Sequence, residues 1–308
     1  SGTFDYFHKT TSDILLAPQV PTVFGTSLSS ENIGEMKNHG WEITLNYHLK
    51  TGEFSHDFSG NIGDSQNKVT KLVGGREISK ADEYFIMKEV GLPFRSYYGY
   101  KIDSYFKTME EIQTSALPAG ISSSDLRPGD VKYVDRNNDG VIDEKDRFVL
   151  GNGFPRYTFG FTYNLEWKGF DFNFFIQGVG KRDMMVRGEL VEPFHSNYSY
   201  AIYKHQLDFW SPTNTDATYP RLAGIGSVSN SNNYGMGSEI NRFDGKYLRL
   251  KNIQLGYTIP KSLTNKLMLQ RVRAYVNAQN LFTLSKNSWI DPESTEFDSN
   301  MGGNANSA

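Results

Sequence analysis

Apolar and polar side chains alternate along residues 156–179, which indicates two β-strands joined by a short turn at Lys168-Gly169. With a two-residue turn, the apolar side chains of both strands share one face, because the pairing register decides the face on which a side chain lies. The predicted opposite pairs are Trp167 with Phe170, Leu165 with Phe172, and Tyr163 with Phe174. The hairpin therefore has one aromatic, apolar face and one polar face.

A second hairpin repeats the pattern at residues 41–62, with its turn expected at Thr51-Gly52. His56, expected opposite Tyr47, is the one polar side chain on the apolar face. Strands of about ten residues with an aromatic, apolar face suit a tilted crossing of a bilayer. A soluble sandwich also alternates, but two such hairpins favour an antiparallel transmembrane β-barrel. The predicted pairs are Leu49 with Phe54, Leu45 with Phe58, and Trp41 with Ile62.

The alternation predicts seven spanning strands, the sixth of which changes phase near Asn252. A β-bulge is one explanation for this change. The alternative is that Leu248 and Leu250 lie above the membrane. The predicted strands are 2–16, 41–50, 53–64, 156–168, 170–181, 246–259 and 271–284.

Short and long connections alternate strictly between these strands. Outer-membrane barrels have short periplasmic turns and long extracellular loops, so we expect every long connection to be extracellular. Residues 260–270 are predicted to form a helical turn on the periplasmic side. Seven strands cannot close a barrel that carries such loops, so we expect an internal fragment of a larger barrel. The long connections are 17–40, 65–155, 182–245 and the tail after residue 285.

The composition agrees with strands rather than membrane helices. The 308 residues include 14% aromatic residues, 29 Gly and no Cys, and the mean hydropathy is −0.52. No run of 18 or more apolar residues exists, which excludes a bundle of membrane helices. The absence of Cys fits an exported bacterial protein. A net charge of −3 without a basic cluster argues against a nucleic-acid partner.

The sharpest local motif is residues 135–146, DRNNDGVIDEKD, which matches a Ca²⁺-binding loop. Its oxygen ligands would stand at loop positions 1, 3 and 5, with a glycine at position 6 and a backbone carbonyl at position 7. The closing residue is Asp rather than the usual Glu, and no helix is expected before the loop. The alternative is an Asx-rich surface turn without a metal. The candidate ligands are Asp135, Asn137, Asp139, the carbonyl of Val141, Asp143 through water, and Asp146.

Aromatic residues of the long connections could contact sugar rings, or pack within the loops or against a partner. We find no catalytic constellation: the six histidines include no His-Glu-x-x-His pair, and His48 and His56 are expected on opposite faces. The protein is therefore not expected to be an enzyme, and substrate-binding residues cannot be assigned. The Gly/Ser/Asn-rich stretch 226–238 is expected to tolerate deletion. The aromatic candidates are Tyr97, Tyr98, Tyr100, Tyr105, Tyr198, Tyr200, Tyr203, Trp210 and Tyr219.

Six blocks of sequence resemble, in this order, successive blocks of the SusC/RagA family of TonB-dependent outer-membrane nutrient importers of Bacteroidetes. The similarity runs from about residue 4 to residue 297. The blocks are GLPFRSYYGYKIDSYFKTMEE, GDVKYVDRNNDGVIDEKDR, GNGFPRYTFGFTYNLEWKGFDFNFFIQGV, YLRLKNIQLGYTIP, VNAQNLFTLSK and DPE.

This resemblance implies a plugged barrel of about 22 strands, of which residues 1–308 would be the C-terminal portion, without the plug and the last strand. It implies TonB-dependent import through the bacterial outer membrane, with TonB contacted by a segment outside this chain. A SusD-like surface lipoprotein would cover the mouth, and the substrate would be an oligosaccharide or, as a lesser option, a peptide. The alternatives are a non-transporting adhesion or structural barrel, and a secreted calcium-dependent glycan-binding protein.

Overall fold

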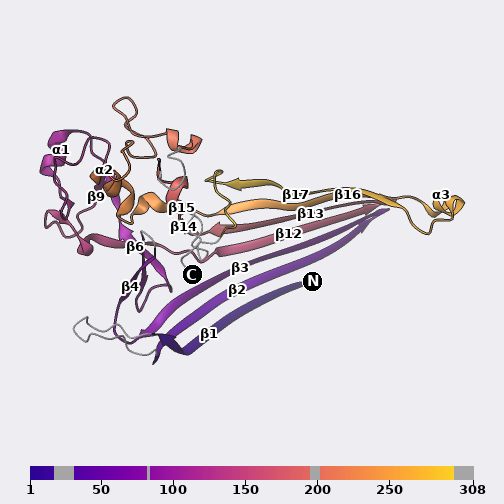
Figure 1. Ribbon diagram of the computed structural model, residues 1–308. Coiled ribbons are helices and arrows are strands. Elements are labelled where there is room, and N and C mark those ends of the chain that lie inside the picture. Colours follow the sequence, from indigo (N-terminus) through magenta and orange to yellow (C-terminus); the bar gives the residue numbers. More distant parts are fainter. Residues whose placement is uncertain (17–30, 82–83, 195–201, 295–308) are drawn as a thin grey trace.

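The computed structural model describes residues 1–16, 31–81, 84–194 and 202–294. Its main element is a seven-stranded antiparallel sheet whose spatial order follows the chain order. The strands lie side by side, with the long connections folded at one end and the tight turns and α3 at the other (Figure 1). The strands are β1 (Gly2–Leu16), β2 (Glu31–Thr51), β3 (Phe54–Leu72), β12 (Arg156–Trp167), β13 (Phe170–Lys181), β16 (Tyr247–Thr258) and β17 (Arg273–Ser285).

All seven predicted strands are present in the predicted order, but β2 and β3 are longer than predicted. β2 begins at Glu31 and β3 ends at Leu72, so parts of the loops predicted at 17–40 and 65–155 are strand. The extensions pair through their backbones, from Gly34 with Leu72 to Gly40 with Ser65. Their side chains are mostly polar, and a backbone ladder needs no apolar face. Hydropathy alternation therefore missed them.

The hairpin at Lys168-Gly169 has the predicted register, with Trp167 opposite Phe170 and Tyr163 opposite Phe174. Both turn residues have positive φ, +46° and +88°, as a type I′ turn requires.

The register predicted for the second hairpin is wrong. Tyr47 lies opposite Phe58, Leu49 opposite His56 and Ile43 opposite Ile62. The turn residues are Gly52 and Glu53, because glycine with positive φ occupies the first central position rather than the second. The turn moves by one residue and the pairing by two, so every side chain keeps its predicted face.

The phase change in the sixth strand is a β-bulge. Phe175 pairs with Asn252 and Ile176 pairs with Leu250, which leaves Lys251 as the extra residue. The register of β16 against β17 also shifts between Leu250 and Asn252. Apolar side chains on both sides of the bulge therefore lie on the same face of the sheet.

The connections between β3 and β12 and between β13 and β16 form one folded body. It contains a four-stranded sheet in the order β11-β6-β5-β4 and three two-stranded sheets, β7-β9, β8-β10 and β14-β15. The strands are β4 (Glu77–Ala81), β5 (Tyr84–Lys88), β6 (Ser96–Tyr100), β7 (Ile102–Tyr105), β8 (Leu117–Pro118), β9 (Val131–Tyr133), β10 (Val141–Ile142), β11 (Arg147–Gly151), β14 (Asp183–Met185) and β15 (Arg242–Asp244).

Short helices complete the described chain. None of those within the described ranges is long and apolar enough to span a membrane. The predicted helical turn at 260–270 is present as α3 and η8. The helices are α1 (Met109–Thr114), η2 (Glu144–Asp146), η3 (Gly188–Leu190), η5 (Lys204–Leu207), α2 (Val228–Asn230), η6 (Ser231–Gly235), η7 (Glu239–Asn241), α3 (Lys261–Thr264) and η8 (Asn265–Leu267).

The buried core lies in this folded body rather than in the sheet. One cluster joins Met184 and Val186 to Tyr234 and Ile240, and another joins Tyr84 and Ile86 to Leu150. The sheet instead exposes large apolar side chains, among them Leu45, Leu255 and Val276 at 61%, 55% and 77%.

Candidate functional site

Polar side chains on one face of the sheet bond to one another across strands. His48 pairs with Asp57 at 2.7 Å, although both side chains are more than half exposed. These cross-strand bonds orient the polar groups and fix the register of this face. The other bonds join Ser59 to Asn46 (2.6 Å), Asn252 to Asn173 (2.9 Å), and Arg273 Nε to Asp171 (3.0 Å).

A depression of about 980 Å³ lies on this polar face, at the end with the tight turns. Lys50, Glu166, Asp171 and Arg271 are among its lining residues. Charges of both signs and amide groups can bind hydrated polar groups by hydrogen bonds. The chemistry that these groups offer is the recognition of polar molecules.

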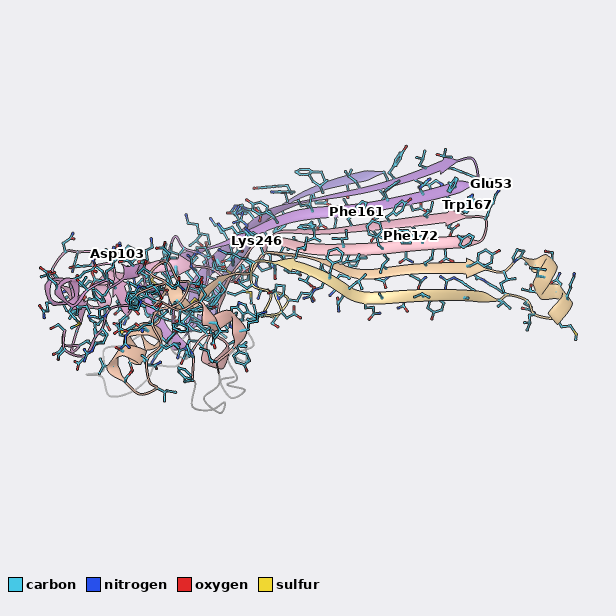
Figure 2. The ribbon with its side chains drawn as sticks, turned by 90° about the horizontal axis from the view of Figure 1, so that it is seen from above. Glu53, Asp103, Phe161, Trp167, Phe172 and Lys246 are labelled. Carbon is cyan, nitrogen blue, oxygen red and sulfur yellow. The ribbon has the colours of Figure 1, made fainter. Side chains whose placement is uncertain are left out.

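The opposite face is apolar, with Phe161 near the middle of its strand, Trp167 at the tight-turn end and Phe172 between them (Figure 2). At that end, Phe54, Trp167, Phe170 and Tyr257 form a row of neighbouring rings across four strands, which we call the aromatic row. Successive ring centroids are 5.3, 5.9 and 4.5 Å apart. Such a row, at one border of an apolar face, is typical of the girdles that mark a membrane interface.

His56 lies on the apolar face, as predicted, and its polarity is satisfied there. Its Nδ1 lies 2.8 Å from the hydroxyl of Tyr163. Its ring stacks between Phe54 and Phe58, with centroids about 6 Å away on each side. A bonded imidazole among aromatic rings costs far less than an unpaired polar group in an apolar setting.

Most of the aromatic candidates are core residues of the folded body. Tyr97, Tyr98, Tyr100, Trp210 and Tyr219 are each at most 7% exposed. This burial favours loop packing over contact with a substrate. Tyr105 is half-buried and donates its hydroxyl to the carbonyl of Thr218 at 2.8 Å, and Tyr203 remains 38% exposed. Tyr198 and Tyr200 lie outside the described residues.

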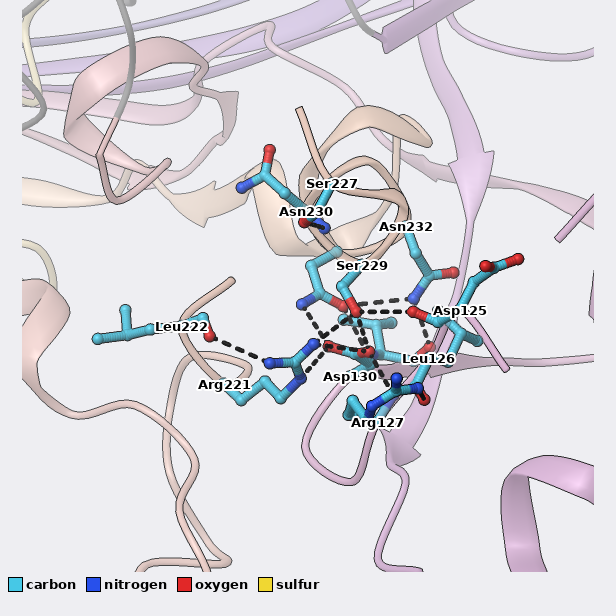
Figure 3. A network of polar contacts seen from close by, with 12 residues as sticks. Asp125, Leu126, Arg127, Asp130, Arg221, Leu222, Ser227, Ser229, Asn230 and Asn232 are labelled. Atoms are coloured by element: carbon cyan, nitrogen blue, oxygen red, sulfur yellow. Dashed lines mark hydrogen bonds and ion pairs between the residues drawn. The ribbon is translucent and has the colours of Figure 1, made fainter. Parts of the chain in front are cut away.

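A buried network around Asp130 ties the two long connections together (Figure 3). Asp130 is fully buried and accepts hydrogen bonds from the backbone N–H of Arg127 (2.8 Å), the amide of Asn233 (3.0 Å) and the hydroxyl of Ser229. Arg221 Nε lies 2.8 Å from Oδ1 of Asp130, the oxygen that also accepts from Asn233, as an ion pair. Sequence patterns missed this residue, because a lone Asp after Pro-Gly reads as an ordinary turn.

The network also corrects the expectation that 226–238 tolerates deletion. Ser229, Asn232, Asn233 and Tyr234 in this stretch are at most 3% exposed. Asn232 donates to the carbonyl of Val131, and Asn233 accepts from the N–H of the same residue at 2.8 Å. The sequence of this stretch resembles a flexible linker because its side chains are small and polar. In the structure, those side chains form the buried hydrogen bonds between the two long connections.

The segment 286–294, after β17, bridges the sheet and the folded body. Arg249, 8% exposed at its side chain, binds Asp291 and Glu293 at 2.6 and 2.7 Å. Arg182 donates to the carbonyls of Pro292 and Ser294. On the other side, Trp289 stacks on His205 (4.3 Å) and Ile290 joins the core cluster of Met184. These contacts hold the body over one end of the sheet.

The predicted calcium loop is held by hydrogen bonds to its own backbone. Asp146 is fully buried and accepts from the N–H groups of Arg136 and Asp143, both at 2.8 Å. Asp135 accepts from the N–H of Gly140 at 2.9 Å through Oδ2, whereas its buried Oδ1 has no hydrogen-bond partner. Asp146 therefore joins the two ends of the loop.

The remaining candidate ligands also have partners in this arrangement. The ammonium of Lys145 lies 3.5 Å from Asp139 and 3.3 Å from Asp143. The amide of Asn137 donates to Asp139 and lowers the pKa of that carboxyl. Within the described ranges, no three His, Cys, Asp or Glu side chains gather as a metal site. Calcium binding stays a prediction that requires Lys145 and Asn137 to reorient.

Comparison with known proteins shows what the chain resembles. No family model matches the sequence. The TonB-dependent receptor P3 of Formosa agariphila is 31% identical over 99% of this chain, and the TonB-dependent receptor SusC of Bacteroides thetaiotaomicron is 26% identical over 95%. The solved structure of the RagAB peptide transporter matches 94% of the chain with a TM-score of 0.72 at 20% identity. Over nearly its whole length, the chain is therefore similar to TonB-dependent receptors of the SusC and RagA type.

The chain spans 30% of the length of P3, 28% of SusC and 30% of the matched RagAB chain. The predicted resemblance is thus confirmed along nearly the whole chain. The structural match shows a shared fold, so the seven-stranded sheet is part of the wall of an antiparallel β-barrel. In an outer-membrane barrel, the polar face of such a wall lines the interior and the apolar face meets lipid.

Proposed function

We propose that the protein containing this chain imports a nutrient through the outer membrane in a TonB-dependent manner. The observation that carries the proposal is the two-faced sheet, apolar outside and hydrogen-bonded inside, with a folded body at one end of the strands. This arrangement suits a polar passage through lipid with an extracellular body at its mouth. The related receptors support the mode of transport.

Fractionation of cells tests the location of the full-length protein. We expect it in the outer-membrane fraction, released only by detergent. A monomer that stays soluble without detergent would overturn the proposal in favour of a secreted glycan-binding protein. A protein of the outer membrane whose deletion leaves uptake of every tested nutrient unchanged would favour a structural or adhesion barrel.

The proposed substrate is an oligosaccharide, because the polar face offers carboxylates, amides and cations that can bind several hydroxyl groups at once. A peptide is the alternative, and the likeness to the RagAB peptide transporter favours it. Growth of a deletion strain on defined oligosaccharides and on defined peptides as sole nutrient separates the two. Lost growth on peptides alone would contradict the oligosaccharide proposal.

A SusD-like surface lipoprotein is the proposed partner of the folded body. Leu207 and Tyr203 are 56% and 38% exposed on the described part of the second long connection. Exposed apolar and aromatic side chains suit a protein interface. We expect the double variant Tyr203→Ser with Leu207→Ser to reduce co-purification of the lipoprotein, whereas Lys246→Ser should not. From the sequence we expect that removal of residues 195–210, in the second long connection, weakens this contact; residues 195–201 lie outside the described residues.

Calcium binding at 135–146 is a second proposal, supported by the buried Asp135 Oδ1 that has no hydrogen-bond partner. Bound Ca²⁺ would take oxygen ligands from Asp135, Asn137, Asp139, the Val141 carbonyl and Asp146, with Asp143 through water, and it would brace this loop. We expect weak affinity, with a Kd on the order of 10⁻⁴–10⁻³ M. Asp135→Asn should weaken binding in a calcium titration, and Lys145→Gln should strengthen it. Equal calcium affinity in all three proteins would refute the site.

A further inference from the structure

The turn between β16 and β17 differs from the other two turns at the same end of the sheet. Those at Gly52-Glu53 and Lys168-Gly169 have two residues each. The turn at 259–272 instead folds into α3 and η8, and it projects beyond the strand ends (Figure 1). Leu269 donates its N–H to the carbonyl of Thr264 at 3.1 Å, and this hydrogen bond closes the turn.

Three large apolar side chains stand exposed on this turn. Leu263 is 55% exposed, Leu269 is 46% exposed and Met268 is 94% exposed. Thr264, at 2%, is instead buried inside the turn. Thr264 is the one buried side chain among those described in this turn, whereas the three large apolar side chains remain open to the surroundings beside exposed polar ones.

The charges of the turn have one sign. Residues 259–272 include Lys261, Lys266 and Arg271 but no Asp or Glu. Two acidic groups at the same end are already paired: Glu53 binds Lys168 at 2.6 Å, and Asp171 binds Arg273. The two lysines are exposed beside the apolar side chains. The turn therefore combines an apolar surface with two lysines, Lys261 and Lys266, that form no ion pair within the described residues, whereas Arg271 lies with Asp171 in the depression of the polar face.

The position of the turn indicates what covers it. It continues from the end of β16 at which Tyr257 belongs to the aromatic row, so it stands at the membrane border on this side. The 14 residues of 259–272 are too few for a standard protein interface, which buries about 20–30 residues on each partner. Phospholipid headgroups at a membrane border supply both acyl chains for apolar groups and phosphates for lysines.

We propose that residues 259–272 form an interfacial anchor that binds phospholipids of the inner leaflet of the outer membrane. Leu263, Met268 and Leu269 enter the border of the acyl region. Lys261 and Lys266 extend to the lipid phosphates, and anionic lipid strengthens the contact. This anchor rests on the proposed outer-membrane location of the barrel. It goes beyond that location because it fixes the position of β16 and β17 along the membrane normal.

Fluorescence quenching tests the anchor in the full-length protein, reconstituted in vesicles of phosphatidylethanolamine with or without phosphatidylglycerol. Single cysteines at Met268→Cys, Leu255→Cys and Glu53→Cys, in a background free of other cysteines, carry an environment-sensitive dye. We expect lipids brominated on the acyl chain to quench the dye at position 268 several-fold more than at position 53. Iodide in the water should show the opposite order.

Position 255, on the apolar face and 55% exposed, is the control for the barrel itself. Lipid quenching at 255 with only iodide quenching at 268 overturns the anchor. Protection of 268 from both quenchers also overturns it, because a protein then covers the turn. Absence of lipid quenching at 255 overturns the proposed membrane location instead.

The role of the lysines is tested by adding Lys261→Gln and Lys266→Gln to the Met268→Cys protein. Phosphatidylglycerol should increase lipid quenching at 268 in the parent and leave it unchanged in the lysine variant. The same increase in both proteins would overturn the assignment of the two lysines to lipid phosphates.

Discussion

The buried carboxylate of Asp130 should control the stability of the folded body. Its substitution Asp130→Asn keeps the size of the side chain but removes the charge that faces Arg221 (2.8 Å). The new amide N–H₂ must also face a donor, because Arg127 and Asn233 each donate to a different oxygen of Asp130. Breaking a buried ion pair costs about 3–5 kcal/mol.

The lower end of that range applies, because the side chain of Arg221 is 25% exposed and water screens it once its partner is lost. A loss of about 3 kcal/mol corresponds to an opening equilibrium that is about 100-fold larger. Hydrogen exchange measured by mass spectrometry, on peptides from 125–134 and 227–236 of the full-length protein, reports this opening.

Asp125→Asn is the matched control, since Asp125 is exposed and accepts only the N–H of Ser122 (3.0 Å) among the hydrogen bonds that its side chain makes in the described chain. Exchange in the control should stay near that of the parent. Unchanged exchange in Asp130→Asn would refute the reasoning, because it would mean that the ion pair and its hydrogen bonds add nothing to the body.

Three further predictions address the sheet, the body and its acid sensitivity. Phe161→Arg, on the apolar face, should cost about 2–4 kcal/mol in urea unfolding from vesicles, whereas Thr162→Arg on the polar face should cost little; equal losses would contradict lipid contact at Phe161. Deletion of 226–238 should expose the body to limited proteolysis, because Asn232 and Asn233 are fully buried; protease resistance equal to that of the parent would contradict it. The hydroxyl of Thr218 and the amide of Asn214 lower the pKa of Asp208 from its ordinary value of 3.8. Because the folded pKa of Asp208 is lowered, the stabilisation is complete above the ordinary value of 3.8. It is lost as the pH falls from there through the folded pKa. Exchange in 208–219, corrected for intrinsic rates, should therefore rise only below about pH 4, and Asp208→Asn should remove this pH dependence.

Side-chain alternation was sufficient to predict the seven strands, their order and the face of each residue. The reason is geometric: a strand places successive side chains on opposite faces. A sheet with one apolar and one polar face therefore shows in the sequence as alternation between neighbouring residues. Even the misplaced turn at Gly52 left the faces correct, since it moved the pairing by two. The ends of β2 and β3 could not be predicted this way, because a ladder of backbone bonds beyond the apolar zone leaves no trace in hydropathy.

The folded body was decided only by the tertiary structure. Its core brings Asp130 and Val131 together with Ser229, Asn232 and Asn233, about one hundred positions apart in a chain that shows no period between them. Small polar residues form such a core when their partners arrive from another connection, and sequence order does not specify those partners. The exposure of Leu263, Met268 and Leu269 was likewise decided by the tertiary structure. An apolar side chain in a turn is buried or exposed according to which other residues the fold places beside it. Local alternation thus determined the wall, and long-range contacts determined the body and the surfaces that remain open to lipid or to a partner.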